Sequence, residues 1–81
     1  MKVSVISPEK TIYEGEADSI IVPAWDGQLG VMKGHAPMLV LLGEGEMHVK
    51  TGGADQTFQI SGGFMQVADD VVTVLSEHAG A

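Results

Sequence analysis

The stretch Asp26–Pro37, DGQLGVMKGHAP, concentrates residues that force the backbone to turn, and apolar runs flank it on both sides. Gly27, Gly30 and Gly34 can take a positive φ at little steric cost, and Pro37 biases the residue before it away from helix. We therefore expect the chain to turn sharply twice here. The residues between the two turns predict a short strand, which is too small to be stable unless a larger sheet holds it.

Short segments of β type precede this stretch. Lys2–Ile6 alternates, with Val3 and Val5 on one face, and the following proline ends the pattern because it cannot donate to a strand ladder. Two further strands are predicted over Thr11–Glu14 and Ala17–Val22, where β-branched and aromatic residues gather.

Two hairpins follow the stretch. Glu46–Lys50 and Gln56–Ile60 alternate strictly around a Gly-Gly turn, which predicts inward-facing side chains at 47, 49, 58 and 60. Phe64–Val67 and Val71–Leu75 flank an Asp-Asp turn and carry apolar residues on both faces. No segment shows helical periodicity, so we expect an all-β fold of about eight to ten short strands, arranged as a sandwich or flattened barrel.

Length and composition limit the possible functions. The 81 residues make one domain, near the size at which a single core only just suffices, so a bound partner could add to its stability. Four lysines, no arginine and a net charge of −7 argue against nucleic acid and anionic membrane surfaces as partners. No apolar run reaches the roughly 20 residues that span a bilayer, and the first one stops short of a signal peptide. The lack of cysteine is compatible with a cytosolic location.

Few residues could carry chemistry. His35, His48 and His78 could gather on one metal ion, as in a small cupin-like β-barrel, although their spacing supports this only weakly and His78 stands in a tail expected to fray. The pieces TGGAD and SGGF lead into no helix and lack the lysine of a phosphate loop, so they are turns. No serine or carboxylate pair meets the needs of nucleophilic or acid–base catalysis, and the chain by itself is expected to be no enzyme and to need no cofactor.

Three motifs stand in a fixed order along the chain: VISPEKTIYEG, then GQLGVMKGHAP with an apolar strand after it, then SGGFMQV followed by VTVL. In this order they resemble the N-terminal β-sandwich of the epsilon subunit of bacterial F-type ATP synthases, from about Val3 to Leu75. The signature G-x-L-G-x-x-x-G-H-A-P makes the resemblance specific. It implies a flattened ten-stranded sandwich in the central stalk, a non-catalytic rotor part that helps couple proton flow to ATP synthesis.

The resemblance also implies partners. The subunit would pack on the gamma subunit and rest on the ring of membrane proteolipid subunits, as a peripheral part of the complex at the cytoplasmic face of the cell membrane. Gly27, Gln28, Leu29 and Gly30 resemble the turn that touches this ring, and many relatives carry a glutamate at the position of Gln28. Against gamma would lie Ser7, His35 and Val40.

The run Met38–Leu42 is continuously apolar between Pro37 and Gly43, which predicts a strand covered on both faces. With Leu39 and Leu41 turned into the sandwich, an outer stripe of Met38, Val40 and Leu42 would complete the gamma interface. The alternative is a core strand with no free face.

The chain departs from the family pattern at its end. Most relatives continue into a C-terminal pair of helices, whereas this sequence ends SEHAGA where that hairpin would begin. We therefore expect residues 1–81 to form a single sandwich domain without the helical hairpin, either as a short form or as a shortened chain.

Overall fold

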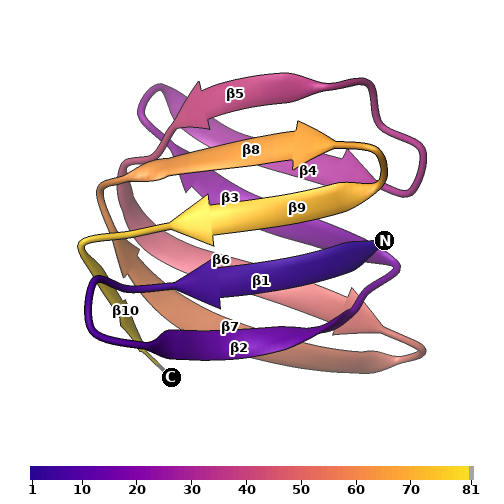
Figure 1. Ribbon diagram of the computed structural model, residues 1–81, viewed down its shortest axis with the longest axis horizontal. Coiled ribbons are helices and arrows are strands. Elements are labelled where there is room, and N and C mark those ends of the chain that lie inside the picture. Colours follow the sequence, from indigo (N-terminus) through magenta and orange to yellow (C-terminus); the bar gives the residue numbers. More distant parts are fainter. Residues whose placement is uncertain (81) are drawn as a thin grey trace.

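Ten β-strands form two five-stranded sheets that face each other in the computed structural model, which describes residues 1–80 (Figure 1). The first sheet has the order β2-β1-β9-β8-β5, and the second has the order β10-β7-β6-β3-β4. No helix occurs within the described residues, so the all-β sandwich expected from the sequence is confirmed. The strand bounds are β1 Lys2–Ile6, β2 Thr11–Glu16, β3 Ser19–Ala24, β4 Gly27–Met32, β5 Met38–Leu41, β6 Glu44–Thr51, β7 Ala54–Ser61, β8 Phe64–Ala68, β9 Val71–Leu75 and β10 His78–Gly80.

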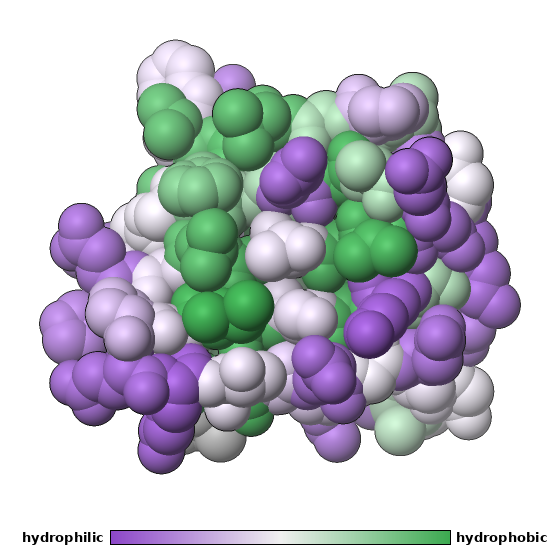
Figure 2. Space-filling model, viewed as in Figure 1, coloured by the Kyte–Doolittle hydropathy of each residue, from purple (hydrophilic) through white to green (hydrophobic). Residues whose placement is uncertain are grey.

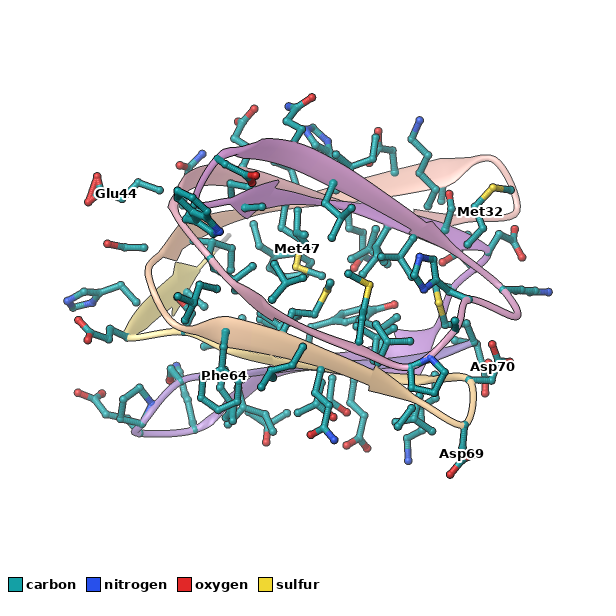
Figure 3. The ribbon with its side chains drawn as sticks, turned by 90° about the horizontal axis from the view of Figure 1, so that it is seen from above. Met32, Glu44, Met47, Phe64, Asp69 and Asp70 are labelled. Atoms are coloured by element: carbon teal, nitrogen blue, oxygen red, sulfur yellow. The ribbon has the colours of Figure 1, made fainter. Side chains whose placement is uncertain are left out.

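The core lies between the two sheets, and alternation along each strand fills it. In β1, Val3 and Val5 are fully buried while their neighbours are not. Met47 projects into the space between the sheets in Figure 3, and no part of its side chain reaches solvent. The inward positions predicted for the first hairpin are confirmed, because the residues at 47, 49, 58 and 60 are all buried.

Both predicted hairpins are present. β6 pairs with β7 from Glu44↔Ser61 to Thr51↔Ala54, and two glycines with positive φ form the turn between them. β8 pairs with β9 around Asp69 and Asp70, whose φ values are 51° and 60°. Two successive residues with positive φ are what a two-residue type I′ turn requires, and aspartate tolerates that conformation better than most residues.

Several strand ends differ from those predicted, and the last strand was not predicted. β3 continues through Pro23 to Ala24 instead of stopping before the proline. The proline is tolerated because pairing between β3 and β6 covers only Ser19–Ile21, so its missing N–H falls beyond that ladder. The tail expected to fray instead forms β10, which pairs antiparallel with β7.

The orientation predicted for Met38–Leu42 is wrong. Leu39 and Leu41 are 70% and 64% exposed, whereas Met38 and Val40 are half-buried against the core and Leu42 is buried. The register with β8 explains the difference, since Met38 and Val40 stand opposite Val67 and Met65, which are both buried. Directly opposite residues share a face of the sheet, so the two leucines point outward.

The glycine-rich stretch turns twice, as expected, but the first turn lies earlier than predicted. Its two turn residues are Trp25 and Asp26, and the residues Gly27–Gly30 belong to β4 and pair with β3. Gly27 has the predicted positive φ of 138°, whereas Gly30 does not. Gly30 stands inside a regular ladder opposite Ile21, and ordinary strand pairing needs no positive φ there.

Candidate protein-binding surface

An apolar row crosses the outer face of the first sheet. Leu41 stands opposite Phe64, Phe64 opposite Leu75, and Leu75 beside Ile6, so four neighbouring strands each contribute one side chain. Figure 2 shows the corresponding band of hydrophobic atoms across the sheet, at the end where β1 and β9 finish. Phe64 lies on the outer side of its sheet in Figure 3. We call these four residues the apolar row.

The row borders a shallow groove at the same end of the sandwich. The groove has a volume of about 330 Å³ and is lined in part by Ser7, Pro8 and Gly63. Gly63 has a φ of 101°, and a Cβ at this position would collide with the carbonyl of Leu75. Only glycine therefore allows β8 to begin so close to the end of β9, which places Phe64 beside Leu75.

Trp25 extends the apolar surface at the tip of the β3–β4 turn. Its side chain is 70% exposed, and its backbone N–H donates to the carbonyl of Leu41 at 3.1 Å, which ties the tip to β5. A second groove, of about 590 Å³, runs between β4 and β5 and is lined by Trp25, Leu39 and Leu41 together with half-buried residues of both strands. Exposed apolar side chains that gather in this way mark interaction surfaces.

The outer face of the second sheet is polar by contrast. His48, in the middle of β6, has its Nε2 3.8 Å from a Glu46 carboxylate oxygen and its Nδ1 3.6 Å from one of Asp55. Nδ1 also lies 3.4 Å from the hydroxyl of Thr57 on the neighbouring strand. The outward residues of β6 and β7 are polar, so the apolar row has no counterpart on these two strands.

Charged side chains tie loops together at the end of the sandwich away from Trp25. The Asp70 carboxylate accepts the N–H of Gly34 at 3.1 Å, and the Asp18 carboxylate accepts the N–H of Gly52 at 2.8 Å. The Lys33 ammonium lies 3.4 Å from Asp18. The Gly52 amide and then Lys33 lower the pKa of Asp18 below its ordinary value, and the Gly34 amide does the same for Asp70.

The predicted interface residues lie far apart along the sandwich. Ser7 follows the finishing end of β1, whereas His35 follows β4 at the opposite end (Figure 1). The Nδ1 of His35 is 2.7 Å from the carbonyl oxygen of Ala36, so the ring of His35 is hydrogen-bonded within its own loop. Four residues were predicted to contact the proteolipid ring. Gly27, Gln28 and Gly30 are exposed, and Leu29 is half-buried.

Sequence reasoning overlooked Trp25 and the pairing that aligns the apolar row. The sequence did contain a signal for Trp25: a tryptophan directly before Asp-Gly stands in a predicted turn, and a turn rarely buries so large a side chain. The apolar row depends on the order of the strands in the sheet, which the sequence does not reveal.

The three histidines do not form a metal centre. Among residues 1–80, no three histidine, cysteine, aspartate or glutamate side chains are placed to hold an ion. His35 lies in a loop, His48 on a strand of the second sheet and His78 on the edge strand β10. The same described part of the chain contains no helix of the length and hydrophobicity needed to cross a bilayer.

Fold and surface together define a β-sandwich domain whose apolar outer face is open to another protein. The family model for the β-sandwich domain of the ATP synthase delta/epsilon chain matches residues 1–81, and the chain belongs to this family. This confirms the resemblance seen in the three motifs and does not favour the cupin-like alternative.

Relatives and solved structures agree with this assignment. The chain is 41% identical over 78 residues to the ATP synthase epsilon chain of Leptospira interrogans, covering 96% of this chain and 61% of the relative. It is 44% identical over 77 residues to the epsilon chain of Nostoc, covering 93% and 56%. For the epsilon chain of Caulobacter vibrioides the identity is 40% over 76 residues, covering 94% and 88%. The chain thus spans about three fifths of the length of the first of these relatives.

A chain in the cryo-EM structure of the Euglena gracilis mitochondrial ATP synthase, described as OSCP/F1/c-ring, superposes with a TM-score of 0.88. The sequence identity is 28%, and the match covers 95% of this chain and 50% of the other. A chain of the Tetrahymena thermophila central stalk and c-ring gives a TM-score of 0.78 at 16% identity, which shows a shared fold.

Proposed function

We propose that this chain is the β-sandwich of a non-catalytic rotor subunit in the central stalk of an F-type ATP synthase. In this role it binds the gamma subunit and the proteolipid ring, and it helps couple proton flow to ATP synthesis at the cytoplasmic face of the membrane. The observation that carries the proposal is the family match over the whole chain, residues 1–81. The chain is not itself an enzyme in this account, but one component of the complex.

The apolar row supports gamma as the partner on the outer face of the first sheet. Leu41, Phe64 and Leu75 stand side by side there, and Ser7 borders the groove at the end of the row. A partner that covers such a face gains an apolar centre with a polar rim, as is usual for stable interfaces. His35, at the other end, and Val40, half-buried in β5, would then lie at the margin of the contact and not at its centre.

The β3–β4 turn supports the proteolipid ring as a second partner. Gly27 and Gln28 follow directly after Trp25 and Asp26, and all four are exposed at one tip of the sandwich. A tip of this kind can reach polar loops at a membrane surface without entering the bilayer. Because Gln28 carries no charge, this contact would depend on hydrogen bonding and on the shape of the turn.

Binding of the purified chain to a purified gamma subunit, measured by calorimetry, tests the proposal. We expect Leu41→Asp to weaken binding by about 3 kcal/mol or more, because the contact would bury an unpaired carboxylate. Thr57→Asp adds the same charge at an exposed position of the other sheet and is expected to leave binding nearly unchanged. Both variants should keep the parent's melting temperature within a few degrees, since both side chains point to solvent. Equal affinities for the two variants would contradict the proposed face.

A further inference from the structure

The backbone of β4 has unpaired hydrogen-bonding groups along one side. β4 is the last strand of the second sheet, and among residues 1–80 it pairs with β3 alone. In an antiparallel pair, alternate residues bond to the partner strand and the residues between them point away. Gln28 stands opposite Pro23, which has no N–H, so Gln28 and Gly30 belong to the set that points away from β3. The described residues offer these two amides no other backbone partner.

This edge lacks the devices that protect two of the other three edges of the sandwich. β2 carries Glu14 and Glu16, and β10 is three residues long. The remaining edge, β5, is uncharged like β4 but only four residues long. β4 is six residues long, GQLGVM, with no charged residue and no proline. Long uncharged edges invite pairing with another chain, and natural proteins usually block them. An edge strand can remain without such protection if a strand of a partner protein covers it in the assembled complex.

The space beside β4 fits an added strand. The groove of about 590 Å³ between β4 and β5 has Leu29, Met38 and Val40 in its lining. All three are half-buried and pack against the core. A strand paired to β4 would place alternate side chains over them and complete the burial that the two sheets leave unfinished.

The net charge of this chain indicates what kind of polypeptide could add a strand to β4. A second copy of this chain would bring another net charge of −7 against the first, which opposes pairing of two copies through this edge. A different polypeptide with lysine or arginine among its outward residues is favoured electrostatically. The groove adjoins Leu41, which also begins the apolar row, so one partner can occupy both.

We propose, on the basis of the function proposed above, that an extended segment of the gamma subunit adds to the free edge of β4 as an eleventh strand. It bonds to the N–H and C=O groups of Gln28 and Gly30, and its inward side chains cover Leu29, Met38 and Val40. The affinity comes from main-chain hydrogen bonds and the register from the alternating side chains, as in other cases of strand addition.

Amide hydrogen exchange of the full chain, with and without purified gamma, tests this proposal. In the free chain the Gln28 and Gly30 amides should exchange fast, while those of Leu29 and Val31, which bond to β3, exchange slowly. With gamma bound, we expect exchange at Gln28 and Gly30 to slow by at least about tenfold. Binding without this protection would overturn the strand addition and leave the proposed function standing. No binding at all would overturn both.

Gly30 offers a matched pair of variants. Gly30→Ala keeps the N–H and adds a Cβ that makes only an ordinary contact, 4.0 Å from the carbonyl oxygen of Ile20, so it should change gamma affinity by less than about twofold. Gly30→Pro removes the outward N–H and should weaken binding by about tenfold. Equal affinities would contradict the proposal, and if Gly30→Pro does not fold, the exchange experiment on the parent decides. Protection of the same amides in the chain alone, rising with its concentration, would mean self-pairing and would overturn the assignment to gamma. Protection that requires the proteolipid ring would overturn it too.

Discussion

Two exposed aspartates act at the scale of single residues, because each holds a turn from another part of the chain. Asp18 accepts the Gly52 amide and pairs with Lys33, and Asp70 accepts the Gly34 amide. Their pKa values are lowered in the folded state. A carboxyl group with a lowered pKa stabilises the fold above its unfolded pKa, near 3.8 here, and this stabilisation is lost as the pH falls through the lower folded value.

We therefore expect both carboxyl groups to titrate below pH 3.8 when followed by NMR, and the melting temperature to fall as the pH drops through that range. Lys33→Met should raise the pKa of Asp18 more than that of Asp70, because Lys33 contributes directly to the first and only weakly to the second. Equal changes in the two values would mean that the Lys33–Asp18 pair does not form in solution.

At the scale of the element, β5 shows how pairing decides which side of a strand meets solvent. Its apolar run MLVL has no alternation, so both orientations were open until the register with β8 was known. The inward side chains are Met38 and Val40.

Val40→Asp is accordingly expected to lower the free energy of unfolding by about 2 kcal/mol or more, because it brings a carboxylate against the core. Leu39→Asp, one position earlier and 70% exposed, should change stability by less than about 0.5 kcal/mol. Urea unfolding of the two variants beside the parent measures the difference. A stable Val40→Asp variant and an unstable Leu39→Asp variant would mean that Leu39 points into the core and Val40 points outward.

At the scale of the whole molecule, the two halves of the chain depend on each other. β1 lies in the interior of the first sheet, antiparallel to β2 and parallel to β9, so residues 2–6 are bonded to residues 71–75. Val3 and Val5 are fully buried. β10, by contrast, is an edge strand, and within the described part of the chain it pairs with β7 alone.

Deleting residues 1–6 should therefore abolish cooperative unfolding, because it splits the first sheet and removes three core side chains, those of Met1, Val3 and Val5. A chain that ends at Glu77 loses only the edge strand β10 and should still unfold cooperatively, at a lower temperature. Thermal unfolding followed by circular dichroism compares the two deletions. A folded chain without β1 would show that the remaining strands form the core by themselves.

The sequence alone determined the all-β class, the inward residues of the first hairpin, the presence of two turns around β4 and the family. These features depend on local chemistry: alternation with a period of two, paired residues with positive φ, and a motif with fixed spacing. Only the tertiary structure decided which side of Met38–Leu42 faces solvent, that Gly30 sits in a ladder, and that Ile6, Phe64 and Leu75 join Leu41 in one row. Each of these depends on which distant strand lies alongside and in what register. Contacts between residues far apart in the chain set that register. A short apolar run without alternation does not indicate the register by itself.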